Sequence, residues 1–241
     1  MEEEIRMEFV ANEEKKVEIE TSTGVYLRHA IQTHFVGVGE SYLDLMERYV
    51  KPVYQEGDII SASEKVIALC QKRIVTEEEC APGFWAKFLS RFVHQTAAGP
   101  GMGLPVKMQF AINTCGVGKV IWAAVCAGFG KLVGKHGVFY DMLGDEVYGL
   151  DGFYGRDIPE YEHMGVRIPE NPAGVCDEIY EKCGILMMIV DASDLAVDLL
   201  GKCAKLDGYT DAQLLEMIAD NPAGQDRQLT PFILIRKQKG C

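Results

Sequence analysis

The sequence predicts a fold that mixes α-helices and β-strands, and three observations favour it. Six consecutive apolar residues, Ile185–Val190, indicate a strand buried on both faces, because a solvent-facing strand would alternate apolar and polar residues. A glycine turn leads into a short strand through Ala62 and then into a helix opened by Ser63. The chain also closes with a strand, Phe232–Arg236. Strands are therefore expected among capped helices along the chain.

The remaining elements follow from local patterns, taken in chain order. The segment KKVEIE alternates weakly and is compatible with an edge strand, and Val25–Val36 is strand-like. Ser41 and Asp44 form a capping box for a helix that Pro52 ends. An aromatic strand is expected next, in HGVFYDMLGDEVYGLDGFYGRDIPEY, and then a helix, AGVCDEIYEKC, closed at Gly184. Two more helices follow. LAVDLLGK suggests the first, and the second is capped by Thr210 and Gln213 and runs through Ala219.

Length and composition describe an ordinary globular protein. The chain has 241 residues, of which 48% are hydrophobic and 25% are charged. Its apolar runs are all shorter than the length of about 18 residues that a membrane helix needs. The N-terminus MEEEIRMEF is acidic, where a signal peptide would be basic and then apolar. We therefore expect a cytoplasmic protein.

Charge and cysteine content restrict the partners and the redox state. The formal net charge of −12 argues against nonspecific nucleic-acid binding, which needs an excess of Lys and Arg. An anionic substrate would then need metal ions or local basic groups to supply positive charge. The eight cysteines contain no C-x-x-C pair and lie mostly in apolar surroundings, which favours reduced thiols over disulfides or a zinc site.

Two residues that follow predicted strands, Asp191 and Lys65, are each open to two interpretations. Asp191 is the first polar residue after the apolar run, so it is either a ligand at the end of the strand or a cap for the helix expected in LAVDLLGK, a role that Ser193 or Asp194 could also fill. Lys65 lies in the first turn of the helix after the Ala62 strand. It either helps to hold a phosphate, or it belongs to an ordinary strand–turn–helix unit.

A segment rich in small residues, 97–137, contains no nucleotide-binding motif. A P-loop needs Gly, four residues, and then Gly-Lys-Ser/Thr. Gly134 and Lys135 fail this test twice, because Phe129 stands at the first glycine and His136 at the hydroxyl position. Close packing of helices is the expected use of these small residues.

Several segments, taken in order, resemble the coenzyme F-420 gamma-glutamyl ligase family, which adds glutamate to the lactyl-phosphate tail of a deazaflavin cofactor. They are IQTHFVGVGESYLDLM, EGDIISASEKVIALCQKRIV, GLDG, IPENPAGVCDEIYEKCGILMMIVDAS and AGQDRQLTPFILIR. The resemblance covers most of residues 25–237 and is looser between 80 and 140. Order and spacing of the segments carry it, because no single motif is diagnostic.

This resemblance implies a GTP-dependent ligase that uses Mg or Mn, on an α+β fold of its own and as a homodimer with intertwined subunits. It implies three metal ligands: Asp151 in a glycine-flanked turn, Asp191 at a strand end, and Gln225 after a glycine. Oxygen ligands of these kinds suit hard divalent cations. The nucleotide is expected to lie against Thr33, His34, Phe35, Val36 and the segment 223–230 with Gly224, and Lys65 is added as a candidate.

Three departures from the family pattern indicate a divergent member. Leu69 stands where the family presents a lysine to the nucleotide, and Lys65, one turn earlier, is the candidate substitute. Tyr154 stands in place of an asparagine that contacts the nucleotide, and Ala192 in place of a metal-binding threonine. These changes affect guanine-nucleotide use more than metal binding. The acceptor need not be the deazaflavin.

The expected reaction joins L-glutamate to a phosphorylated carboxylate acceptor through an acyl phosphate. Nucleotide, glutamate and acceptor are the expected partners, with no nucleic acid and no membrane. Residues 1–24 are expected to be an extension or edge strand and 25–241 the ligase-like domain. A metal-dependent phosphohydrolase and a noncatalytic ligand-binding relative remain alternatives. No catalytic residue is assigned, because none of the five histidines lies in a catalytic motif.

Overall fold

The structure of this chain is a computed structural model that describes residues 8–93, 101–135, 137–153, 159–192, 196–224 and 228–238. Its contacts divide the chain into two units. Unit 1 combines Met1–Lys72 with Pro169–Cys241, and unit 2 is the intervening segment Arg73–Ile168. Unit 2 is therefore an insertion in the chain of unit 1. With helices and strands in both, the protein belongs to the α+β class.

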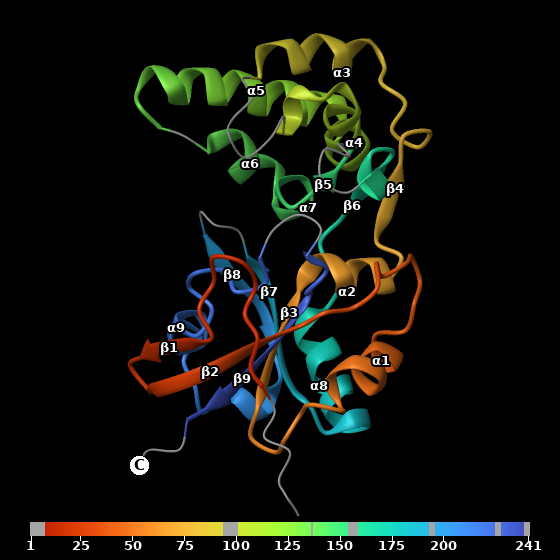
Figure 1. Cartoon of the computed structure of the whole chain (residues 1–241). Helices are drawn as coiled ribbons and strands as arrows, with labels where there is room; N and C mark the ends of the chain where they lie inside the picture. Colours follow the sequence, from red (N-terminus) through yellow and green to blue (C-terminus); the bar gives the residue numbers. More distant parts are fainter. Residues whose placement is uncertain are drawn as a thin grey trace, which may run out of the picture. The chain divides into compact units, whose positions relative to one another are not determined.

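Unit 1 is built on a six-stranded mixed sheet, drawn in Figure 1. The strand order is β1-β2-β9-β3-β7-β8. Only β3 and β7 pair in parallel among the described strands, and the other neighbours are antiparallel. The strands are β1 (Glu18–Thr21), β2 (Gly24–Ile31), β3 (Ile59–Ser63), β7 (Leu186–Ala192), β8 (Val197–Lys202) and β9 (Phe232–Lys237).

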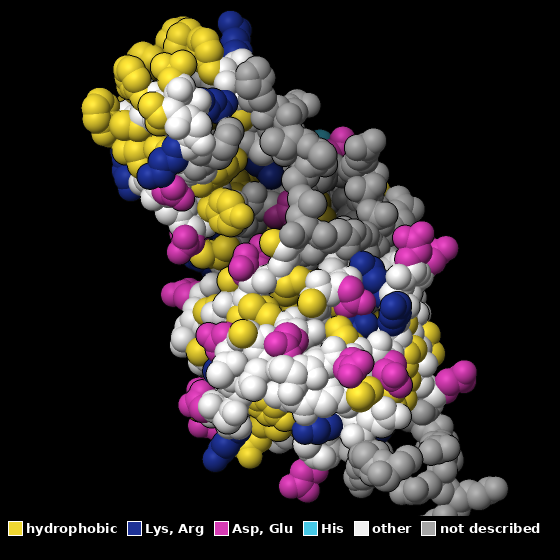
Figure 2. Space-filling view, turned by 90° about the vertical axis from the view of Figure 1, so that its left-hand side faces the viewer, with side chains coloured by type: hydrophobic (Ala, Val, Ile, Leu, Met, Phe, Trp, Pro, Cys, Tyr) yellow, Lys and Arg dark blue, Asp and Glu magenta, His cyan; other side chains and the backbone are white. Residues whose placement is uncertain are grey.

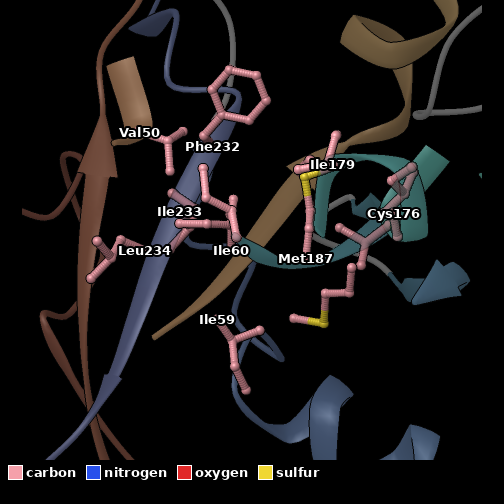
Figure 3. Close-up of a cluster of buried hydrophobic side chains, with 14 of the residues drawn as sticks. Val50, Ile59, Ile60, Cys176, Ile179, Met187, Phe232, Ile233 and Leu234 are labelled. Carbon is pink, nitrogen blue, oxygen red and sulfur yellow. The ribbon is translucent and has the colours of Figure 1, made fainter. Parts of the chain in front are cut away.

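The central strands of this sheet carry the core of unit 1. Ile59 and Ile60 of β3, Met187 of β7 and Phe232 of β9 are all buried, because helices and loops cover both faces. Figure 3 shows these side chains packed beside Ile179 from a covering helix. The apolar runs in the sequence therefore correspond to the strands with the least exposed side chains.

Short helices with defined ends flank the sheet. They are α1 (Tyr42–Leu45), the π-helical turn η1 (Met46–Val50), α2 (Glu64–Cys70), α8 (Pro172–Cys183), the 3-10 turn η5 (Ala204–Leu206) and α9 (Asp211–Glu216). The predicted capping box of Thr210 and Gln213 is present, and Gly184 closes α8 in the left-handed conformation. Ser63 occupies the N-cap position of α2, but its side chain makes no capping hydrogen bond.

Unit 2 contains a small antiparallel sheet and a group of helices. The sheet order is β4-β6-β5, with β4 (Ile74–Thr76), β5 (Asp151–Gly152) and β6 (Met164–Val166). The helical elements are α3 (Phe84–Leu89), η2 (Ser90–Phe92), η3 (Gly101–Gly103), α4 (Pro105–Cys115), α5 (Val117–Leu132), α6 (Val138–Leu143), α7 (Asp145–Tyr148) and η4 (Pro159–Tyr161). As predicted from the small residues, close helix packing occurs here: a Cβ on Gly130 would lie 3.0 Å from the Val138 side chain.

Three predicted elements differ from the structure, and a fourth, the helix capped by Thr210, ends at Glu216 rather than at Ala219. The helix expected in LAVDLLGK is strand β8, because pairing with β7 satisfies the backbone of both segments better than an isolated turn of helix. The aromatic strand expected after Gly137 begins instead with helix α6, which packs on α5 between two positive-φ glycines, Gly137 and Gly144. The first long strand ends at Ile31 rather than Val36.

Two further findings concern the whole described chain. Each helix that the structure describes is by itself too short or too polar to cross a membrane. Taken together, α4 and α5 have the length and apolar composition of a membrane-spanning segment, but they are bent by 116° at their junction. The seven described cysteines are free thiols. Burial raises the pKa of Cys176 and of Cys70 to about 12, so both stay protonated and poorly nucleophilic at neutral pH.

Candidate functional site at one edge of the sheet

Four segments of unit 1 come together at one edge of its sheet. Ser63 at the end of β3 is level with Val190 of β7, and because these strands are parallel their following residues emerge at the same edge. Strand β9 runs in the opposite direction, and its first residue, Phe232, is level with Ala62 of β3 and with Ile31, the last residue of β2. The loop after β2, the start of α2 after β3, the end of β7 and the residues just before β9 therefore share this edge.

The predicted nucleotide segments lie side by side there. The backbone N–H of Thr33 donates to the carbonyl of Leu229 over 2.9 Å, which joins the loop after β2 to the segment 223–230. The N–H of Ser63 donates over 2.9 Å to the carbonyl of Pro231, just beyond that segment. Lys65 follows two residues later in the first turn of α2. The structure thus brings together three segments that are separate in the sequence.

Gly224 lies in a tightly held turn within this edge. Its φ of +71° is favourable only for glycine, and an added Cβ would lie 1.6 Å from Oε1 of Gln228. Asn12, which the sequence did not single out, holds the turn: its Nδ2 donates over 2.8 Å to the Pro222 carbonyl and to Thr230 Oγ1. Leu229 adopts a positive φ of 52°, a conformation that costs free energy in a branched residue.

His34 is held by two side chains of its own unit. Its Nδ1 lies 2.7 Å from the hydroxyl of Tyr49, and its Nε2 lies 2.9 Å from Oε2 of Glu40. The neutral tautomer with hydrogen on Nε2 satisfies both contacts, because Tyr49 then donates and Glu40 accepts. The Gly37 N–H, which also donates to Glu40, lowers the pKa of that carboxyl. Both ring nitrogens are engaged, so His34 orients the loop, and its ring face is what remains for a ligand.

Of three further residues considered for the nucleotide site, Val36 and Leu69 are buried, and only Phe35 is partly exposed. Val36 is buried in the hydrophobic core of unit 1, whereas Phe35 is partly exposed. Leu69 is only 1% exposed, which means that the position where the family carries a nucleotide-binding lysine faces the protein interior here. Lys65 is partly buried and precedes it by about one turn. The backbone of the loop, rather than the side chain of Val36, is available to a nucleotide.

Asp191 lies near the end of β7, directly opposite a second acidic residue on the neighbouring strand. In the antiparallel β7–β8 pair it is directly opposite Asp198, so the two side chains lie on the same face of the sheet. The capping interpretation of Asp191 is wrong, because the segment that follows is a strand and not a helix. Asp198 was missed in the sequence because it fell inside the expected helix. Like charges at directly opposite positions repel, which a bound cation would relieve.

Asp151 belongs to unit 2, where it forms β5 with Gly152. Its Oδ1 accepts a hydrogen bond of 2.7 Å from the N–H of Gly152. A Cβ on Gly152 would lie 2.2 Å from the Met164 carbonyl oxygen, so this turn requires glycine for close pairing with β6. The glycine-flanked turn expected from the sequence is present, and its glycine has a structural role.

The expected metal ligands belong to different parts of the chain. Asp191 lies in unit 1 and Asp151 in unit 2, while Gln225, like Tyr154, lies outside the described residues. Within the described ranges, no three His, Cys, Asp or Glu side chains are grouped closely enough to hold a metal ion. What the described part of unit 1 offers at this edge is two carboxylates, Asp191 and Asp198, at directly opposite positions of β7 and β8.

A scan of protein-family models finds no match for this chain, and a search of curated protein sequences finds none either. The assignment of function therefore depends on the geometry of the sheet edge and on the residues gathered there.

Proposed function

We propose that the sheet edge of unit 1 binds a nucleoside triphosphate together with Mg or Mn, and that the protein is a ligase that joins L-glutamate to a carboxylate acceptor. The observation that carries the proposal is the convergence of Thr33 from the loop after β2, Lys65 from the first turn of α2, Asp191 near the end of β7, and the segment that precedes β9. The resemblance assigns Thr33, Asp191 and the segment 223–230 to nucleotide and metal, and Lys65 is the candidate substitute for the family's lysine. Following the same resemblance, the nucleotide is GTP and the enzyme is a homodimer; the cytoplasmic location is the expectation from the sequence.

Asp191 and Asp198 would hold the divalent cation. Their paired carboxylates supply the hard oxygen ligands that Mg and Mn prefer, and phosphate oxygens of the nucleotide would add further ligands. The cation would neutralise charge on the phosphoryl group during its transfer. Asp151 and Gln225 remain predicted ligands from the resemblance.

The chemistry proceeds in two transfers. The terminal phosphoryl group of the nucleotide passes to the acceptor carboxylate, which leaves a nucleoside diphosphate and an acyl phosphate. The amine of glutamate then attacks the acyl carbon, loses a proton and displaces inorganic phosphate, which forms the amide. The loop residues Thr33 to Val36 position the nucleotide, and Lys65 brings positive charge to its phosphates. A carboxylate such as the lactyl-phosphate tail of coenzyme F-420 fits this role.

A noncatalytic nucleotide-binding protein is the second candidate, and two residues favour it. Leu69 is buried where the family has its lysine, and the methyl side chain of Ala192, at the end of β7, offers no oxygen to a metal. Product analysis separates the candidates, including the phosphohydrolase. A ligase consumes nucleotide only when acceptor and glutamate are both present, a phosphohydrolase needs neither, and a binding protein consumes none.

We expect Mg or Mn and GTP together to raise the melting temperature by more than the sum of their separate effects. Phosphate oxygens bridge to a cation held by carboxylates, so each ligand increases the affinity for the other. At ligand concentrations near 100 times the dissociation constant, the shift should be about 5–10 °C. Thermal unfolding with each ligand alone and with both measures it. Strictly additive shifts would contradict a shared site.

The variant Asp191→Asn should lose at least about tenfold in metal affinity, because outer-sphere changes already cost that much and Asp191 is proposed as a direct ligand. Isothermal titration with Mn in the presence of nucleotide measures the affinity. Asp207→Asn is the matched control, since this highly exposed carboxylate of unit 1 lies beside Lys202 and not at the sheet edge. Equal losses in both variants would show that Asp191 has no special role.

A further inference from the structure

Positive charge is concentrated in one part of unit 2. Between Cys80 and Tyr140 the sequence has no Asp or Glu, whereas the whole chain has 36 of them against 24 Lys and Arg. The basic residues of this stretch are Lys87, Arg91, Lys107, Lys119, Lys131 and Lys135. All of them are exposed except Lys107, whose Nζ donates to the Leu150 carbonyl. A strongly acidic protein thus presents one cationic region.

Helix α3 and the turn η2 carry exposed aromatic rings in that same region. Phe84 is 73% exposed and Phe92 is 66% exposed. Phe88 contacts both, with ring centroids 6.1 Å from Phe84 and 5.2 Å from Phe92, and Trp85 lies beside them. The rings therefore form a continuous row on the surface, where water would otherwise have to solvate them.

Helix α5 is turned with its large apolar side chains outward. Its buried positions include the small residues Ala123 and Gly130, while Trp122, Phe129 and Leu132 are 61%, 67% and 82% exposed. A helix that served only its own core would bury the large residues and expose the small ones. Helices α3 and α5 are in contact, and Figure 2 shows hydrophobic side chains gathered at the helical end of unit 2, with Lys and Arg side chains around them.

We propose that this surface, called the apolar face and formed by Phe84, Phe88, Phe92, Trp122, Phe129 and Leu132, binds the surface of an anionic lipid bilayer. Aromatic and aliphatic side chains would enter the boundary between headgroups and acyl chains, and the surrounding lysines and Arg91 would contact anionic headgroups. Such attachment needs no membrane-spanning helix. It departs from the sequence expectation of no membrane partner, and it does not depend on the proposed ligase activity.

Charge complementarity selects the bilayer over a second copy of the chain. An interface formed by two identical apolar faces would bring the exposed Lys119, Lys131 and Lys135 of both copies together, with no acidic residue of the stretch to balance them. Anionic headgroups instead attract each of these cations. The exposed residue types, Trp, Phe and Leu beside Lys, are also those found on helices that lie in the plane of a membrane surface.

The two tryptophans of the chain, Trp85 and Trp122, both lie on or beside the apolar face, so their fluorescence reports on it directly. The full-length protein is mixed with vesicles of phosphatidylcholine alone or with added phosphatidylglycerol. We expect a blue shift, quenching by brominated acyl chains and co-flotation with the anionic vesicles, all reduced by high salt. Absence of binding, or equal binding to both vesicle types, would overturn the proposal.

Three double variants separate the contributions. Trp122→Ser with Phe129→Ser should weaken partitioning to anionic vesicles by about a hundredfold or more. Lys119→Gln with Lys131→Gln should weaken it by about thirtyfold. The control is Lys182→Gln with Lys205→Gln, which removes the same charge from exposed positions of unit 1 and should leave binding unchanged. Circular dichroism and melting temperature confirm that each variant is folded.

Sedimentation without lipid tests the competing occupant. If the apolar face joined two copies, the tryptophan blue shift would appear on raising protein concentration alone, and Trp122→Ser with Phe129→Ser would convert dimers to monomers. That result would overturn the bilayer proposal. A sedimentation profile that this variant leaves unchanged, together with its loss of vesicle binding, would support it.

Discussion

Replacing Asp220 by asparagine should lower the free energy of unfolding by about 3–5 kcal/mol, because it leaves a buried positive charge without its partner. Arg28 is only 2% exposed, and its guanidinium group is paired with both carboxylate oxygens of Asp220. Its remaining bonds go to the carbonyls of Lys16 and Met217, and its Nε has no hydrogen-bond partner in the described part of the chain. Asp220 therefore supplies the only negative charge in this set of contacts.

Replacing the other partner, Arg28, should lower the free energy of unfolding by less. Arg28→Met leaves Asp220, whose side chain is 40% exposed, with access to water, so we expect a loss of about 1–3 kcal/mol. Urea denaturation followed by far-UV circular dichroism measures both losses. The double variant Arg28→Met with Asp220→Asn should recover part of the stability lost in Asp220→Asn alone. A larger loss in Arg28→Met than in Asp220→Asn would contradict this account.

The same pair predicts acid sensitivity. Burial alone would raise the pKa of Asp220, but hydrogen bonds and charge from Arg28 outweigh it and hold the pKa below its ordinary value. The pair therefore stabilises the fold fully above the unfolded-state pKa of about 3.9, and the contribution is lost as pH falls through the lower folded-state pKa. The Asp220→Asn variant should lack this component of the acid transition.

Replacing Phe232 by alanine should also cost about 3–5 kcal/mol, the range for deleting a large buried aromatic side chain. Phe232 is fully buried at the start of β9, between Ile31 of β2 and Ala62 of β3. Figure 3 shows its ring in the cluster of core side chains. Because it lies where the loops of the sheet edge begin, the cavity should also weaken nucleotide binding.

Phe232→Leu is the matched control, and it should cost less than about 1.5 kcal/mol because most of the apolar volume is kept. Urea denaturation gives both values, and the thermal shift with Mg and GTP reports the site. An alanine variant that lost less than about 1 kcal/mol would show that this edge of the core can collapse around the missing ring.

The sequence by itself determined the central strands and the best-defined helix ends. Strands β3, β7 and β9 followed from apolar segments, because a strand covered on both faces can be apolar at every position. The capping box at Thr210 and the left-handed Gly184 were predictable because each is satisfied by hydrogen bonds within a few residues. The segments of the candidate site were also named from sequence, through their resemblance to a family.

Only the tertiary structure decided which segments pair and which side of a helix faces outward. Residues 197–202 form a strand because β7 offers its backbone as a partner, which placed Asp198 opposite Asp191. Val138–Leu143 form a helix because α5 covers them. The sequence of α5 is apolar on all sides, so its pattern could not indicate that Trp122 and Phe129 are exposed. Each outcome depends on contacts between residues far apart in the chain, whose free energy exceeds the small local preferences for helix or strand.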